Sequence, residues 1–257
     1  MSALLRMEAS KLFRLTSVRA SLVLLVVFPL LWSYAPGIYE VYGFYLVSGF
    51  QVPALSLLSS MEFLMPLLIA ITAAELVGME KMHGTLPTVL LRPVTRSQWL
   101  LAKLLVLSVY PFLAMAFFLL ASLVAGTPYG FGSFVGGTGL GEGGLAGAGA
   151  MSVQAAVGEI LAAYALAAVS LVPIALLAVL ATVVTMSAAS GALATLSVLI
   201  VMQLLVVFPG LEPYLLSRQL SAYTDPAAGV GWVVALIALY AAAFAAVAVV
   251  LFERKDF

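Results

Sequence analysis

A polar segment between the second and third apolar runs of the chain carries the side chains best suited to contact a soluble partner. It reads Glu80-Lys81-Met82-His83-Gly84-Thr85-Leu86-Pro87 and continues through Leu90-Leu91-Arg92-Pro93-Val94-Thr95-Arg96 to Lys103. Gly84 can break a helix, and Thr85 can cap a new one whose early proline lacks only a donor that is unpaired anyway. Pro93 disfavours helical geometry at the preceding residue, and Thr95-Arg96-Ser97-Gln98 then predicts a capping box that opens the third span. These signals predict a short helix with the mixed apolar and charged surface typical of a protein contact.

Other reactive constellations are missing. The sequence has no cysteine and one histidine, His83, which excludes disulfides, Cys/His metal sites and a Ser-His dyad within the membrane. A formal G-x-G-x-x-G match begins at Gly139, but no strand precedes it and no helix clearly starts from it. No phosphate-binding G-x-x-x-x-G-K-[ST] motif occurs. We therefore expect no enzymatic activity, no metal site and no cofactor in this chain.

Three polar residues within apolar runs are candidates for a transport pathway: Glu62, Glu159 and Gln203. A carboxylate at the bilayer centre would cost a few kcal/mol on insertion scales, so Glu62 should be protonated, paired or in contact with water. Counted from Gly84, however, Glu62 lies near the outer end of its helix, which favours an interfacial role. Gln203 could equally bond a neighbouring helix.

Composition and hydropathy place these residues in an integral membrane protein. Hydrophobic residues make up 64% of the chain and charged residues 9%, with a mean hydropathy of +1.19. The net charge is zero, which argues against a nucleic-acid surface. Six apolar runs approach the roughly 20 residues of a membrane-spanning helix; they cover residues 20–39, 54–78, 97–125, 155–185, 192–208 and 230–252. The runs do not alternate as barrel strands would, so we expect an all-α membrane protein with six transmembrane helices.

The distribution of lysine and arginine sets the expected orientation. With the N-terminus in the cytoplasm, every basic residue except Arg218 lies inside or at the inner boundary. Residues 1–19 then form either an interfacial helix or a cytoplasmic extension of the first span. A secretory signal peptide is the competing interpretation of the first run, but no clean cleavage site follows it.

Glycine, alanine and proline give the remaining architectural signals within the single domain, residues 1–257. Residues 126–149 hold eleven of the 21 glycines and predict a flexible external loop. Alanine crowds the fourth and sixth spans, which favours close helix packing in lipid. The prolines within the spans, at positions 29, 66, 111 and 173, predict kinks.

The polar segment also resembles a family signature. The pattern from Glu80 through Gly84-Thr85-Leu86, Leu90-Leu91 and Pro93-Val94-Thr95-Arg96 to Lys103 is similar to E-R-x-x-G-T-L…L-L…P-V-S-R…K, found in permease subunits of type 2 ATP-binding-cassette (ABC) exporters. The ending Phe252-Glu253-Arg254-Lys255-Asp256-Phe257 resembles the F-x-R-R-D terminus common in that family. Lys81 in place of arginine and Thr95 in place of serine are mild departures.

The resemblance implies a multi-pass transmembrane subunit in the cytoplasmic membrane, with both termini inside, that pairs with a second, identical or homologous permease subunit. Cytoplasmic nucleotide-binding ATPase subunits would hold ATP and magnesium and dock on residues 79–96 as a coupling loop. The residues that the resemblance assigns to that contact are Glu80, His83, Gly84, Thr85, Leu86, Leu90, Arg92, Pro93 and Arg96. Residues 209–228 would form an external segment that dips partway into the membrane. An ion-gradient-driven transporter or channel is the alternative that the residues leave open.

Overall fold

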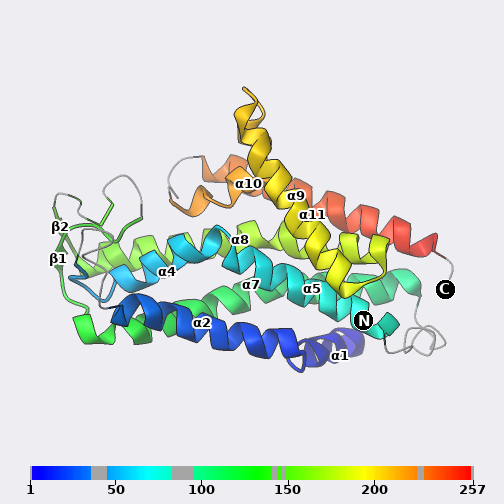
Figure 1. Ribbon diagram of the computed structural model, residues 1–257, viewed down its shortest axis with the longest axis horizontal. Coiled ribbons are helices and arrows are strands. Elements are labelled where there is room, and N and C mark those ends of the chain that lie inside the picture. Colours follow the sequence, from blue (N-terminus) through cyan, green and yellow to red (C-terminus); the bar gives the residue numbers. More distant parts are fainter. Residues whose placement is uncertain are drawn as a thin grey trace.

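The computed structural model describes residues 2–35, 45–82, 95–140, 144, 145, 147, 149–224 and 229–255, and these are mostly helical. Its elements are α1 (Ser2–Leu12), α2 (Thr16–Tyr34), α4 (Gln51–Met61), α5 (Leu64–Met82), α7 (Arg96–Gly126), η1 (Thr127–Tyr129), β1 (Phe134–Val135), β2 (Ala150–Met151), α8 (Val153–Thr185), α9 (Ala188–Leu204), η2 (Leu205–Val207), η3 (Glu212–Tyr214), α10 (Leu216–Gln219), η4 (Ala222–Thr224) and α11 (Val230–Glu253). Most long helices run along one axis, while α9 crosses the bundle obliquely (Figure 1). We name the two ends of the bundle by the elements there, the hairpin end for β1 and β2 and the α1 end for α1.

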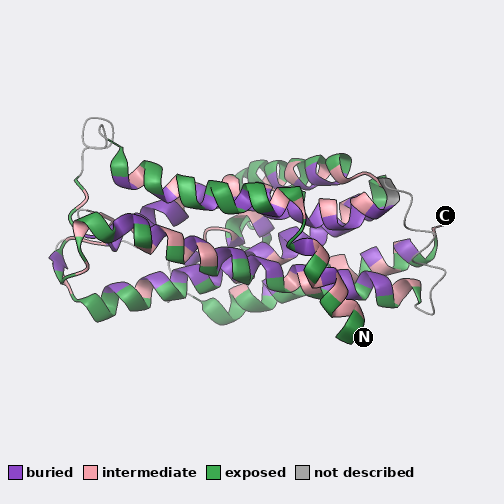
Figure 2. Ribbon diagram, turned by 90° about the horizontal axis from the view of Figure 1, so that it is seen from below, coloured by how far each residue is buried: buried purple, intermediate pink, exposed green. Residues whose placement is uncertain are grey.

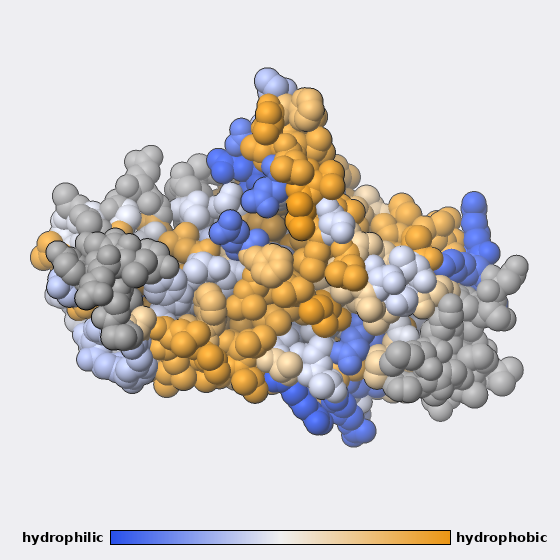
Figure 3. All heavy atoms as spheres, viewed as in Figure 1, coloured by the Kyte–Doolittle hydropathy of each residue, from blue (hydrophilic) through white to orange (hydrophobic). Residues whose placement is uncertain are grey.

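Within the described residues, five helices are long and apolar enough to cross a membrane: α2, α7 with η1, α8, α9 with η2, and α11. The pair α4 and α5 passes the same test together, although it is bent by 62°. Apolar residues cover much of the face in Figure 3, and hydrophilic residues gather below, near α1, and at the far right. Helices of this length and composition indicate a membrane protein.

The kink that Pro66 predicts in the apolar run 54–78 is confirmed, as a 62° bend at a break between two helices. Helix α4 ends at Met61 and α5 begins at Leu64, so Glu62 and Phe63 separate two segments. Pro66 gives the physical reason, because its ring has no N–H to bond the carbonyl of Glu62 and clashes with that carbonyl in a regular helix. By contrast, α2, α7 and α8 continue through Pro29, Pro111 and Pro173.

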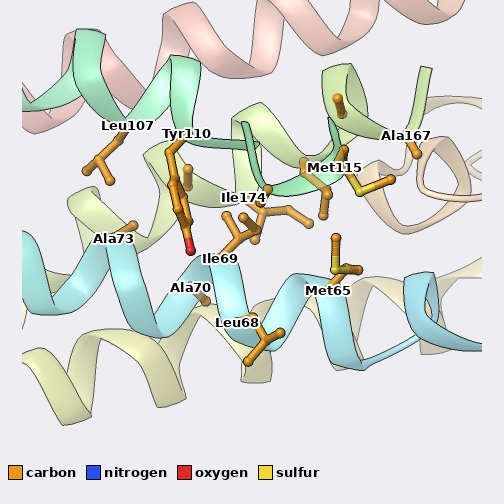
Figure 4. Close-up of a cluster of buried hydrophobic side chains, with 14 of the residues drawn as sticks. Met65, Leu68, Ile69, Ala70, Ala73, Leu107, Tyr110, Met115, Ala167 and Ile174 are labelled. Carbon is orange, nitrogen blue, oxygen red and sulfur yellow. The ribbon is translucent and has the colours of Figure 1, made fainter. Parts of the chain in front are cut away.

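Helix α8 forms the centre of the bundle and packs against α5, α7, α9 and α11. It is apolar on every side, and 72% of its most apolar 18-residue stretch is buried. Side chains of α5 and α7 meet those of α8 in the cluster drawn in Figure 4, where Ile69, Leu107 and Ile174 are fully or almost fully buried. Small alanines such as Ala163 and Ala167 let the helices approach closely.

The alanines of α11 behave differently from the expectation. Only 17% of the most apolar window of α11 is buried, and among residues 241–248 only Ala248 is buried. The colouring by burial shows long helices with one buried and one exposed side around the buried centre (Figure 2). Close packing of the sixth apolar run is therefore confined to a few positions within one chain.

A capping box fixes the start of α7, directly after the polar segment. Thr95 Oγ1 accepts a hydrogen bond from Gln98 N, and Thr95 N donates to Gln98 Oε1, each at 3.2 Å, which confirms the capping box that Thr95 and Gln98 predict.

The glycine-rich segment lies at the hairpin end, where Phe134 pairs with Met151 and Val135 with Ala150 in an antiparallel hairpin. The Gln51 amide also donates to the Gly137 carbonyl at 3.0 Å. The described part of the glycine-rich segment is thus packed on α4 rather than detached from the bundle.

Candidate functional site

Four charged side chains, here named the ionic cluster, meet at the α1 end: Glu8 and Lys11 from α1, Glu80 from α5 and Lys103 from α7. The Lys103 Nζ lies 2.6 Å from Glu8 Oε2 and 2.9 Å from Glu80 Oε1. The Lys11 Nζ lies 2.7 Å from Oε1 of both carboxylates. Two ammonium groups therefore bridge two carboxylates, and the cluster carries no net charge.

Burial makes this arrangement energetically demanding. The side chains of Glu8 and Lys103 are 0% exposed, and removing such ions from water costs several kcal/mol each unless they are fully paired. The Lys103 ammonium uses its third proton on the Leu76 carbonyl at 2.9 Å. The second Glu80 oxygen accepts from the Trp99 indole N–H at 3.1 Å. All three protons of the Lys103 ammonium and both oxygens of the Glu80 carboxylate therefore have hydrogen-bond partners.

Aromatic packing connects the ionic cluster to the C-terminal helix. The Trp99 and Phe252 rings stack at a centroid distance of 4.9 Å with an interplanar angle of 15°. The Lys103 Nζ lies 4.7 Å from the centroid of a Trp99 ring, within the range of a cation–π interaction. Both rings are buried. One end of α11 is therefore held against the start of α7.

A second set of polar contacts fixes the start of α7 to the ends of α8 and α11. The Arg96 Nη1 donates to the Lys255 carbonyl at 2.6 Å. The Lys255 Nζ donates to the carbonyls of Val183 and Val184, at 2.5 and 2.8 Å. These carbonyls belong to the last turn of α8, where four acceptors lack intrahelical partners and a cation is favoured. Arg96 and Lys255 thus join three helix ends.

The two carboxylates beside the Lys11 ammonium raise its pKa. Partial burial on its own lowers the pKa of Lys11, but the hydrogen bonds and charges of Glu8 and Glu80 outweigh that effect and raise the pKa above its usual 10.5. Lys11 is therefore fully charged at neutral pH. The side chain remains 34% exposed, so water reaches this edge of the ionic cluster.

The residues expected at an ATPase contact divide into two groups. Glu80 and Arg96 are described, and they lie on the two sides of the polar segment, each bonded to other helices of the bundle. Glu80 is only 8% exposed. His83, Gly84, Thr85, Leu86, Leu90, Arg92 and Pro93 lie outside the described residues, so their predicted roles stay predictions.

Sequence reasoning gave no role to Glu8 or Lys11 and treated Lys103 only as part of the family signature. One signal was available, since Trp99 and Lys103 are four residues apart and share one face of a helix. Reasoning from the sequence also missed Glu75, whose Oε2 accepts from the Ser17 N–H at 3.2 Å. Ser17 lies in the first turn of α2, where a carboxylate is favoured by unpaired amides and by the helix dipole.

A pocket of about 450 Å³, here named the break pocket, lies where α4 and α5 separate. Its walls come from the break itself, from α9 and from the segment between Glu212 and Tyr223. Glu62 and Gln203, two of the three predicted pathway residues, both line it. Glu159 does not; its carboxyl group lies beside the Thr138 side chain near the hairpin end. The structure thus brings Glu62 and Gln203 together and places Glu159 elsewhere.

The polar groups of the break pocket are unevenly paired. The Arg218 Nε lies 3.1 Å from Glu212 Oε1, so these two charges compensate each other. Within the described residues, the Glu62 carboxylate has neither an ion pair nor a hydrogen bond. Burial raises the pKa of Tyr223 to about 12, and the nearby negative charge of Glu62 contributes to that rise. Tyr223 is therefore a neutral hydroxyl at physiological pH, beside an uncompensated carboxylate.

Comparison with known proteins gives a family without a function. No curated protein matches the sequence. A family model described as "Protein of unknown function (DUF2705)" matches residues 20–257, which is nearly the whole chain and leaves out only α1 and the start of α2. The chain that forms this bundle, its ionic cluster and its break pocket belongs to the DUF2705 family.

Proposed function

We propose that this chain is the transmembrane subunit of an ATP-driven ABC exporter, powered by separate ATPase subunits that contact the segment between α5 and α7. The observation that carries the proposal is the double attachment of that segment. Glu80 precedes it and is tied to α1 and α7, whereas Arg96 follows it and is tied to the ends of α8 and α11. A force applied to the segment would therefore act on all of these helices together.

The arrangement of the chain ends supports the proposed topology. The start of α1, the end of α5, the start of α7 and the end of α11 lie at the same end of the bundle in Figure 1. An even number of spans has this property, and α4 with α5 supplies the sixth if the bent pair counts as one. Lysine and arginine are concentrated at this end, which we assign to the cytoplasm of the cell membrane. Residues 209–224 would then lie at the outer side.

Glu80 acts in this proposal by positioning rather than by touching the ATPase. Its carboxylate faces the ionic cluster, where it fixes the direction in which α5 ends. The direct contact falls to residues 83–93, with Leu86 and Leu90 as its apolar part. An ATPase that binds one arrangement of the bundle more tightly than another shifts the equilibrium by that difference in affinity. A second permease subunit would complete the pathway.

Affinity purification from the native membrane tests the proposal. The tagged chain should capture a nucleotide-binding subunit and show ATP hydrolysis, whereas the chain purified alone should show none. A variant in which residues 84–93 are replaced by a Gly-Ser linker of equal length should lose the ATPase and keep its second permease subunit. A linker of the same kind in place of residues 144–149, at the hairpin end, serves as the control. Capture that survives replacement of residues 84–93 contradicts the proposal.

The break pocket favours a second candidate, an ion-gradient-driven transporter or channel. Broken helices and unpaired carboxylates mark ion sites in secondary transporters, and Glu62 lies at such a break. Purified chain in proteoliposomes distinguishes the two candidates. Cargo movement driven by a proton or sodium gradient without ATP supports the transporter, and movement that requires ATP and the captured subunit supports the exporter.

A further inference from the structure

The break pocket has the size and position of a ligand site. Its volume of about 450 Å³ lies within the roughly 300–1,000 Å³ of small-molecule sites. Three parts of the chain that are far apart in sequence line it: the α4–α5 break, α9 with η2, and the segment from Glu212 to Tyr223. Side chains from all three parts can therefore contact a molecule bound in the pocket.

The charge of the pocket selects the sign of its ligand. Among the described residues, four titratable side chains line it: Glu62, Glu212, Arg218 and Tyr223. Arg218 and Glu212 compensate each other, and Tyr223 is neutral at physiological pH. Within the part of the chain that the structure describes, this leaves the carboxylate of Glu62 without an opposite charge. A monovalent cation beside Glu62 would make the pocket neutral, whereas an anion would add to the uncompensated charge.

The walls of the pocket select an apolar body for that cation. Leu196, Leu199 and Ile200 of α9 face Leu58 and Met61 of α4 across it. Leu199 is 8% exposed and Met61 1%, so the inner part of these walls is set in the packed bundle, whereas Ile200 is 54% exposed. The Gln203 amide gives a polar group that can orient a ligand without adding charge.

The depth of Glu62 suits such a molecule. Helix α5 has 19 residues, and at a rise of about 1.5 Å per residue it is roughly 28 Å long. This is close to the roughly 30 Å of hydrocarbon in a bilayer. With the α1 end at one membrane surface, Glu62 lies near the opposite boundary, where a charged group can remain hydrated while its apolar body lies in the pocket.

We propose that the break pocket binds an amphipathic cation, a single positive charge on an apolar body, with Glu62 as the counter-ion. As a site on an export pathway, this inference rests on the proposed function; the binding itself needs neither ATP nor an ATPase. The positively charged group can belong to a soluble organic cation, or it can be the ammonium of an aminolipid headgroup whose phosphate stays in the aqueous interface. Both sources present the same chemistry to Glu62.

Equilibrium binding to the purified chain tests the inference. The probe is radiolabelled tetraphenylphosphonium, and the neutral competitor of related shape is triphenylphosphine oxide. The wild-type chain should bind the cation saturably, and Glu62→Gln should bind it at least tenfold more weakly, which is about 1.4 kcal/mol. Glu62→Asp should retain most of the affinity. Glu159→Gln, which removes a carboxylate outside the pocket, should leave the affinity unchanged.

Two further experiments complete the test. One changes the volume of the pocket without changing the charge of Glu62, and the other distinguishes the two sources of the cation. Leu199→Trp should fill the pocket and abolish binding while leaving Glu62 in place. In nanodiscs of phosphatidylglycerol, adding phosphatidylethanolamine should weaken tetraphenylphosphonium binding to the wild type if an aminolipid is the natural ligand, and should leave it unchanged if a soluble cation is. Either result keeps the proposed chemistry.

Equal affinity of Glu62→Gln and the wild type, with both proteins monodisperse, overturns the inference. Equal competition by triphenylphosphine oxide does so as well, because it removes the requirement for charge. If the tagged chain captures an ATPase but the purified wild-type chain does not bind tetraphenylphosphonium, only the ligand assignment is overturned. If the tagged chain captures no ATPase from its native membrane and the purified chain still binds tetraphenylphosphonium, the exporter is overturned and the site remains.

Discussion

Replacement of Lys103 by methionine removes the central cation of the ionic cluster at nearly constant side-chain length. Glu8 and Glu80 would then share Lys11 alone, and one negative charge would stay buried without a partner. Removal of one partner from a buried pair typically costs about 3–5 kcal/mol. The Lys103 side chain is 0% exposed, so water cannot take its place without a rearrangement of α1. We expect Lys103→Met to lower the free energy of unfolding by about 3–5 kcal/mol.

A second substitution separates charge from packing. Glu8→Gln in the Lys103→Met background leaves one cation, Lys11, and one anion, Glu80, so the cluster is neutral again. We therefore expect the double variant to be more stable than Lys103→Met, with a coupling free energy between the two sites of about 1–3 kcal/mol. Unfolding by SDS titration of the purified protein, followed by tryptophan fluorescence and circular dichroism, measures both quantities.

Lys11→Met is the matched control for the same chemical change. Lys11 also contacts both carboxylates, but its side chain is 34% exposed, so solvent screens the loss. We expect a cost of about 1 kcal/mol, in the range of partly exposed pairs. The reasoning is refuted if Lys103→Met costs no more than Lys11→Met, or if Glu8→Gln fails to offset any of the loss at Lys103.

Three further predictions concern pH, capping and backbone contact. Because the folded-state pKa of Lys11 is raised, its contribution to stability is complete below pH 10.5 and is lost as the pH rises through the higher folded-state pKa; unfolding titrations of the wild type and Lys11→Gln should therefore converge only in strong alkali. Thr95→Ala should cost about 1 kcal/mol through loss of the capping box at the start of α7, with Thr95→Ser retaining the stability. A Cβ at Gly49 would collide with the carbonyl of Gly126, so Gly49→Ala should destabilise by about 1–3 kcal/mol, whereas Gly158→Ala in α8, with nothing within 4 Å, should stabilise by about 0.5–1 kcal/mol; thermal unfolding in detergent compares the two.

Much of the helical framework follows from hydropathy because a membrane-spanning helix must be long and apolar. The starts of α7, α8 and α11 lie within about two residues of the expected runs, and the Thr95 cap is a local signal that the structure reproduces. The break at Glu62 was predictable only in part. Proline at position 66 indicates a kink, but whether a helix kinks or ends depends on the neighbours that receive the freed carbonyl.

The candidate sites show where sequence reasoning ends. Glu62 and Gln203 were selected as polar residues in apolar runs, and they line one pocket because α9 crosses the α4–α5 break. Glu8 could not be selected, since nothing in the sequence of α1 tells which side of the helix faces α7. Lys103 is separated from Glu8 by 95 positions, and only tertiary packing brings their charges together.

Photo-cross-linking at the segment between α5 and α7 tests the central claim most directly. Benzoylphenylalanine placed at Leu86 or Leu90, in cells that express the full chain in its native membrane, should form adducts with a cytoplasmic nucleotide-binding ATPase. The same probe at Val135, an exposed residue of β1 at the opposite end of the bundle, should form none. Adducts at Leu86 and Leu90 that contain only lipid or this chain itself, or ATPase adducts at Val135, would contradict the proposal that energy enters through this segment.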